Sequence, residues 1–95
     1  MPKKRSELEV AAGRLVSAIQ KEWTAEIGED SARESEAIVH RSHGLLQAAK
    51  AQTLGKLLGE RTVAHYVGES WLKRHPRVLA AVRELQILVK GAHAV

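Results

Sequence analysis

Three residues with metal-binding side chains fall at helical spacing: Glu36, His40 and His43 are four and then three residues apart. Because an α-helix turns once every 3.6 residues, a helix here would place all three on one side. Carboxylate and imidazole suit zinc, iron or nickel, and a fourth ligand such as His65 would have to come from elsewhere. The alternative is an exposed surface pair of Glu36 and His40, which we favour because acids and histidines recur at this spacing by chance.

A basic stretch runs from Lys73 to Arg77 in the order Lys-Arg-His-Pro-Arg. Pro76 is well suited to the first position of a helix, because its fixed φ fits the first turn and no amide donor is needed there. The free amides of a helix N-terminus attract phosphate or carboxylate groups, and Lys73, Arg74 and Arg77 would add to that attraction. The alternative is a solvated corner with no ligand.

Two aromatic residues, Tyr66 and Trp71, lie just before this basic stretch. Exposed, they could stack on nucleobases. We favour the alternative that both are core residues, because aromatic side chains at helical spacing usually pack inward. The sequence has no Phe, so these two would anchor a core otherwise poor in large side chains.

Residues 51–68 partly match a helix-turn-helix motif, with Gly59 at the turn and Thr62 at the start of a second helix. The turn is about two residues too short, because Val63 follows the glycine by only four residues. A nucleic-acid interface would also need cations from this segment and from the basic stretch. The residues that we expect to contact an anionic partner are Lys56, Arg61, Lys73, Arg74 and Arg77.

Catalytic motifs are missing from the sequence. It has no cysteine, no serine in a nucleophile elbow and no glycine-rich phosphate loop, and its five histidines are scattered. A helical chain of 95 residues also rarely encloses a deep pocket. We therefore predict a non-enzymatic protein without a cofactor.

Hydrophobic periodicity predicts helices throughout the chain. Leu8, Leu15 and Ile19 lie on one stripe of the first, and Val82, Leu85 and neighbours on one stripe of the last. The predicted helices span residues 6–27, 31–58, 62–74 and 76–90. Short connections favour an all-α, compact bundle of about four helices.

The helix boundaries rest on capping signals. Ser6 with Glu9, and Ser31 with Glu34, have the spacing of capping boxes, and Gly28 suits a left-handed helix end. The second helix contains Gly44, where a kink or break would be least costly, so its continuity is left open. Within the third helix Gly68 is a comparable weak point, and Gly91 is predicted to end the fourth.

The length fits one domain over residues 1–95, with tails at 1–5 and 92–95 that we expect to be flexible. No apolar run is long enough to cross a bilayer, and no secretory signal is recognisable. We therefore predict no membrane partner and a cytoplasmic location, which the lack of cysteine fits. The basic start, Lys3–Arg5, is interpreted as a solubilising tail, with a minor-groove arm or a localisation signal as the alternatives.

Charge is divided unevenly along the chain, whose pI is near 9.8. Residues 6–36 carry eight acids and three bases, whereas residues 37–95 carry nine bases and three acids. The basic half favours, slightly, a nucleic-acid-associated or regulatory protein. The alternative is a protein–protein interaction module, either an adaptor or a self-associating dimer in which acidic and basic faces meet. The helix-borne metal site is the third hypothesis.

Overall fold

The regular elements of the chain are helices, as predicted, in the computed structural model, which describes residues 7–93. They number more than four, because the third quarter of the chain is divided into short segments. In chain order they are α1 (Glu7–Glu26), α2 (Ala32–Lys50), α3 (Leu54–Leu58), α4 (Val63–Val67), α5 (Glu69–Arg74), the 3-10 helix η1 (Pro76–Val78) and α6 (Leu79–His93).

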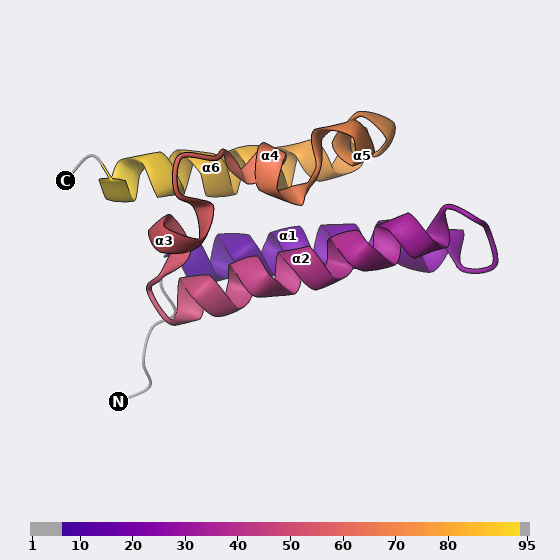
Figure 1. Cartoon of the computed structure of the whole chain (residues 1–95), viewed down its shortest axis with the longest axis horizontal. Coiled ribbons are helices and arrows are strands. Elements are labelled where there is room, and N and C mark those ends of the chain that lie inside the picture. Colours follow the sequence, from indigo (N-terminus) through magenta and orange to yellow (C-terminus); the bar gives the residue numbers. More distant parts are fainter. Residues whose placement is uncertain (1–6, 94–95) are drawn as a thin grey trace.

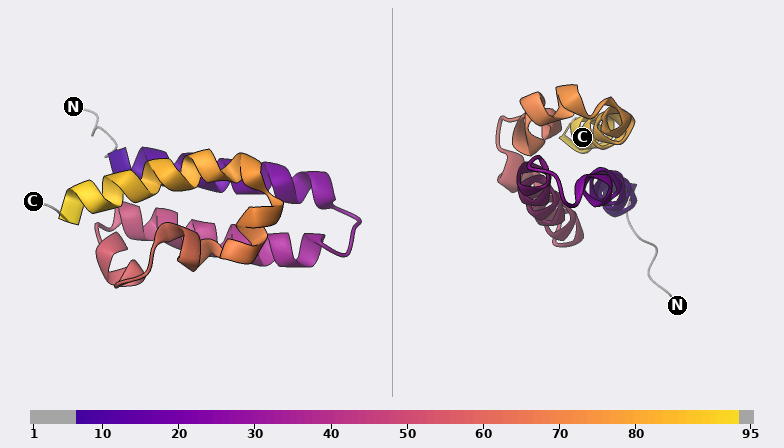
Figure 2. Two further views of the ribbon diagram at one scale, coloured as in Figure 1. Left: turned by 90° about the horizontal axis from the view of Figure 1, so that it is seen from above. Right: turned by 90° about the vertical axis from the view of Figure 1, so that its right-hand side faces the viewer.

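The helices form two layers (Figure 1). The hairpin of α1 and α2 makes one layer, and α6 with α4 and α5 makes the other, while α3 connects the layers at one end. Seen end-on, α1, α2 and α6 occupy three corners of a bundle, and the short helices take the place of a fourth (Figure 2). The prediction of a helical bundle is therefore right in outline, but its fourth member is not one continuous helix.

The core lies between these layers and consists mainly of aliphatic side chains. Leu15 and Ile19 of α1 are fully buried with Leu45 of α2 and Leu85 of α6. Trp71 is the largest fully buried side chain, so its prediction as a core anchor is confirmed. Tyr66 is partly buried against the same core.

The end of α1 agrees with the sequence prediction. The helix ends at Glu26, and Gly28 has the left-handed φ of 97° that favours glycine. The predicted capping box at the start rests on Ser6, which lies outside the described residues.

The second predicted capping box is wrong. Ser31 has helical backbone angles and its side chain makes no capping hydrogen bond. Glu34 instead reaches across to pair with Arg74 of α5. The spacing of Ser31 and Glu34 fits a capping box, but the Glu34 carboxylate forms an ion pair with Arg74, 40 residues away in the sequence.

The second helix does not run to residue 58 and does not break at Gly44. It passes through Gly44, where an added Cβ would lie 3.4 Å from the Tyr66 hydroxyl, and it ends at Lys50. The Thr53 amide then donates to the Ala48 carbonyl (2.8 Å) and the Gln52 amide to the Ala49 carbonyl (3.3 Å). This is a Schellman end with Gln52, at φ 61°, in the position usually held by glycine.

The third predicted helix is divided at Gly68 into α4 and α5. Its predicted cap is confirmed, because the Thr62 side chain accepts a hydrogen bond from the His65 amide at 3.0 Å. Gly68 has a φ of 129°, and an added Cβ there would also meet Ile38 at 3.4 Å. The positive φ at this turn therefore favours glycine, whereas an added Cβ would make ordinary van der Waals contact with Ile38.

The last helix begins as expected and ends later than expected. His75 leaves the helical conformation before Pro76, which opens η1 and leads into α6. The helix then continues through Gly91 to His93, so the predicted stop at Gly91 is wrong. Among the described residues, no helix is both long enough and apolar enough to span a membrane.

Candidate functional site

The predicted anion-binding residues of the α3 end are Lys56 and Arg61. Lys56 is exposed and makes no hydrogen bond or ion pair to a described residue. Arg61 is occupied locally: its guanidinium donates to the carbonyls of Leu57 (2.8 Å) and Leu58 (3.2 Å) and lies 5.2 Å from the centre of the Tyr66 ring. It therefore caps α3 rather than being presented to a ligand.

The other predicted cations lie around α5 and η1, at the opposite end of the molecule (Figure 1). Arg74 pairs with Glu34 and also donates to the Ser70 carbonyl at 3.4 Å. Lys73 and Arg77 are exposed and have no partner among the described residues. The structure thus places the five cations at two ends of the bundle and not on one surface.

The predicted helix-turn-helix segment consists of two helices of five residues each, α3 and α4. Val63 and Val67 of α4 are buried, so little of this helix is exposed to read a DNA groove. Buried Trp71 is also not available as a stacking platform.

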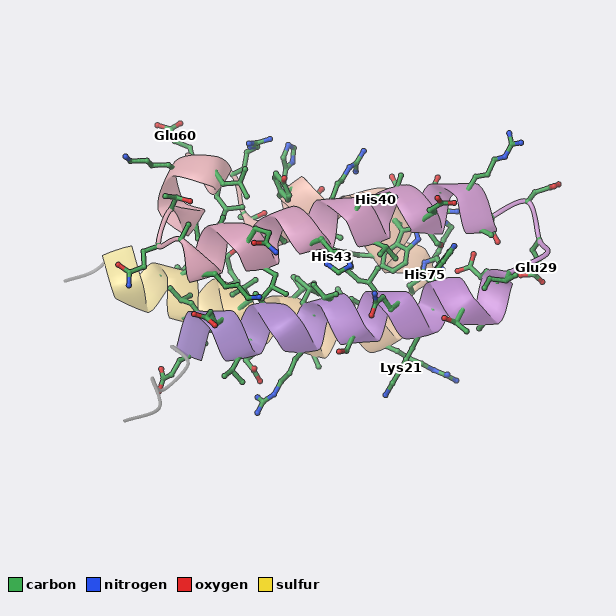
Figure 3. The ribbon with its side chains drawn as sticks, turned by 90° about the horizontal axis from the view of Figure 1, so that it is seen from below. Lys21, Glu29, His40, His43, Glu60 and His75 are labelled. Carbon is green, nitrogen blue, oxygen red and sulfur yellow. The ribbon has the colours of Figure 1, made fainter. Side chains whose placement is uncertain are left out.

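The metal candidates separate in space. Glu36 and His40 are exposed neighbours, with 3.9 Å between Oε1 and Nε2. His43 lies instead between α1 and α2, where its Nε2 is 3.4 Å from the Gln20 amide nitrogen (Figure 3). Within residues 7–91, no three acidic or histidine side chains come close enough to hold an ion together.

A shallow groove of about 830 Å³ lies along α1 and beside η1. Its floor is formed by side chains that are small or absent, because Gly13, Ser17, Ala18 and Ala25 recur on this side of the helix. Lys21 lies here and points away from α2 (Figure 3). The complete lining is Val10, Gly13, Arg14, Ser17, Ala18, Lys21, Glu22, Ala25 and Arg77.

The groove is basic on balance. Arg14 is paired with Glu84 of α6 at 2.9 Å, but Lys21 and Arg77 have no ion-pair partner in the described part of the chain. Glu22 is the single acid in the lining. Two of the three cations were missed by sequence analysis, because Arg14 and Lys21 belong to the acidic half of the sequence. Only the fold brings them beside Arg77.

A buried polar cluster lies next to this groove, at the junction of α1, α2 and α5. The Trp71 indole N–H donates to the Ser35 hydroxyl (2.9 Å), which donates to Oε1 of Glu26 (3.0 Å). The same carboxylate oxygen lies 2.6 Å from Nε2 of His75, and both of these side chains are only 13% exposed. Sequence analysis missed this cluster, because Glu26 and His75 are 49 residues apart.

His75 uses both of its ring nitrogens within the protein. Nδ1 lies 2.8 Å from the Trp71 carbonyl, and the imidazole stacks on the Trp71 indole with 4.0 Å between ring centres. A histidine that serves as a general base needs one nitrogen free to face a substrate. In this structure both nitrogens of His75 are instead engaged by groups of the chain itself.

The surroundings of the Glu26 carboxyl change its pKa in opposite directions. Burial, the largest, raises its pKa, whereas the neighbouring Ser31 side chain, the hydrogen bonds with His75 and Ser35 and the charge of His75 lower it. Together the lowering effects prevail, and the pKa of Glu26 lies below the ordinary value of 4.5. The ionised form of this carboxyl is thus favoured by the folded chain.

Comparison with protein-family models, with curated proteins and with solved structures finds no match to this chain.

Proposed function

We propose that this chain is a non-enzymatic protein–protein interaction module that pairs with a second copy of itself through the basic groove on α1. The observation that carries the proposal is the groove itself: small side chains allow close approach, and the cations of Lys21 and Arg77 are left without partners inside the described chain. Unpaired surface cations beside a shallow groove suit the carboxylates of a docking partner.

The acids that fit this groove lie in the turn after α1. The carboxylates of Glu29 and Asp30 are exposed and make no ion pair or hydrogen bond to a described residue. Lys21 precedes Ala25 by four residues and Glu29 follows it by four. In a two-fold contact with its axis near Ala25, each Lys21 would therefore face the Glu29 of the other copy, because a residue before the axis meets one after it.

An exposed apolar side chain lies in the same stretch. Among the large hydrophobic side chains of the described residues, Ile87 of α6 (69%) and Ile27 (62%) are exposed, and Ile27 lies two residues beyond Ala25. A dimer centred near Ala25 would cover it. The lack of cysteine suits the reducing cytoplasm, where we propose that the module works.

Light scattering during size-exclusion chromatography tests the proposal. We expect a mass near twice 10.4 kDa at low salt that falls toward the monomer as salt screens the charges. The variant Lys21→Glu/Arg77→Glu should be monomeric, whereas Lys56→Glu, at the other end of the molecule, should still dimerise.

A charge swap makes the test specific. Glu29→Lys/Asp30→Lys should also be monomeric when studied alone, because the basic turn of one copy would repel the basic groove of the other. Mixing it with Lys21→Glu/Arg77→Glu should restore a dimer, since each groove then faces a turn of opposite charge. A wild-type monomer at every salt concentration, or a mixture that stays monomeric, would show the proposal to be wrong.

Nucleic acid is the second candidate partner, and the unpaired cations of Lys21, Lys73 and Arg77 favour it. It predicts co-elution with a DNA fragment at low salt and release at high salt. The same Lys21→Glu/Arg77→Glu variant should then lose DNA binding.

A further inference from the structure

The Glu26–His75 contact depends on how many protons the two side chains carry. The Trp71 carbonyl can only accept a hydrogen bond, so Nδ1 of His75, 2.8 Å away, must carry a proton. Nε2 lies 2.6 Å from Oε1 of Glu26, a distance that requires a second proton between the two atoms. Both contacts of His75 are therefore formed when the pair is one proton above a neutral imidazole plus an ionised carboxylate, that is, when the imidazole is protonated beside the carboxylate or a neutral imidazole faces the carboxylic acid.

Loss of that shared proton breaks one of the two contacts. A neutral imidazole has a single N–H, which can serve the Trp71 carbonyl or the Glu26 carboxylate but not both. The unserved contact then sets two lone pairs against each other. Ser35 offers no substitute, because its hydroxyl already donates to Glu26 while accepting from Trp71.

Gain of a further proton also weakens the contact. The remaining position is Oε2 of Glu26, which is buried and has no hydrogen-bond partner among the described residues. A proton there removes the negative charge that holds His75. The contact is therefore fully formed at one protonation level only.

Both ends of the contact adjoin the groove. Glu26 follows Ala25, and His75 precedes Pro76 and Arg77, so each is one or two residues from a lining residue. The His75 carbonyl accepts the Val78 amide at 3.1 Å, which ties η1 directly to this residue. His75 and Arg77 therefore belong to the same turn of backbone.

We propose that the Glu26–His75 contact is a proton-controlled latch, which holds η1 and Arg77 against α1 most firmly while the pair keeps its shared proton and loosens when that proton is lost at higher pH. Control of dimer formation by the latch rests on the function proposed above, whereas the latch itself does not. The lowered pKa of Glu26 agrees with a carboxylate held by a donor.

Other charged groups surround the latch on every element that forms it. Glu22 and Lys21 lie one turn earlier on α1, the Glu34–Arg74 ion pair joins α2 to α5, and Arg77 lies on η1. The turn after α1 adds Glu29 and Asp30. Among these groups His75 is the single histidine.

Nuclear magnetic resonance of the isotope-labelled chain tests the latch without any partner. We expect the amides of Ala25 and Arg77 and the Trp71 indole N–H to shift with the same midpoint as the His75 ring. His75→Gln should abolish that common titration. His40→Gln removes an exposed histidine and is the matched control, which should leave the titration unchanged.

A second variant, Glu26→Gln, tests the latch even if His75→Gln does not fold. In Glu26→Gln, the side-chain amide can donate to a neutral Nε2, so the contact no longer needs the shared proton. The groove amides should then stay in the latched position as pH rises. Groove amides that ignore the titration of His75, or that still titrate in His75→Gln, would overturn the latch.

Light scattering at the same pH values separates the two proposals. A dimer that weakens with the His75 midpoint supports both. Coupled titration in a chain that is monomeric at every pH supports the latch and contradicts the dimer. A dimer whose stability does not follow the His75 midpoint contradicts the latch as its regulator.

Discussion

Two pairs of an aromatic and a basic side chain lie at the two ends of the segment that runs from Arg61 through α4 and α5 to His75. At one end the His75 ring stacks on buried Trp71, and at the other the Arg61 guanidinium lies over the partly buried Tyr66 ring. The first pair has partners on α1 and α2, 36 to 49 residues away in the sequence. The hydrogen bonds of Arg61 reach only three to four residues back.

The difference shows what each pair can contribute. A local, solvated contact competes with water and stabilises the fold only slightly. In a buried network that joins distant segments, removing one member costs more, because each partner left unpaired in the interior carries a desolvation cost. We therefore expect substitutions at the Trp71 end to be far more costly than those at the Tyr66 end.

Trp71→Ala should have the largest effect. It removes the largest fully buried side chain together with the indole donor to Ser35, and should lower the free energy of unfolding by about 3–5 kcal/mol. Urea denaturation measures this difference. Trp23→Ala, at a partly buried tryptophan, is the control and should cost clearly less. Equal losses at the two tryptophans would contradict the importance of the buried end.

Glu26→Ala should follow, with a loss of about 2–3 kcal/mol, because it leaves His75 and Ser35 without their shared acceptor. His75→Ala should cost a similar amount. Since the two residues act as one contact, the double variant should cost less than the sum of the single losses, by about 0.5–3 kcal/mol. Additive losses in this cycle would show that the two side chains contribute independently.

Acid should weaken the same end. The pKa of Glu26 is lowered by folding, so its stabilising contribution is complete above the ordinary value of 4.5 and is lost as pH falls through the lower folded value. The free energy of unfolding should therefore decrease as pH falls from 4.5 through the lower pKa that Glu26 has in the folded chain. In Glu26→Gln this part of the acid dependence should be missing. An identical acid profile in wild type and variant would assign the loss to other carboxyls.

The sequence predicted those parts of the fold that local patterns determine. The all-helical class, the end of α1 near Gly28, the Thr62 cap and the boundary at His75–Pro76 each depend on residues within a few positions. The missed end of α2 had no such signal, because Gln52 occupies the position where glycine usually marks it.

The candidate site was predictable only in part for a similar reason. Arg77 was identified because it belongs to a run of bases. Arg14 and Lys21 were missed because only the packing of η1 beside α1 brings them to the same groove. Glu26 and His75 are 49 residues apart, so no spacing in the sequence predicts their contact. Glu34 was predicted to cap a helix but pairs with Arg74 instead.

Arg61→Ala should have the smallest effect of the series. The variant loses two hydrogen bonds to the end of α3 and the contact with the Tyr66 ring, all close to solvent, so we expect about 0.5–1 kcal/mol. Tyr66→Leu keeps the Arg61 hydrogen bonds and removes only the contact with the aromatic ring. Comparing the two variants therefore separates the contribution of the hydrogen bonds to stability from that of the ring contact. If Arg61→Ala cost as much as Glu26→Ala, exposure and sequence distance would not explain the difference between the two ends. A loss near the expected value would support the view that stability is concentrated where α1, α2 and α5 meet.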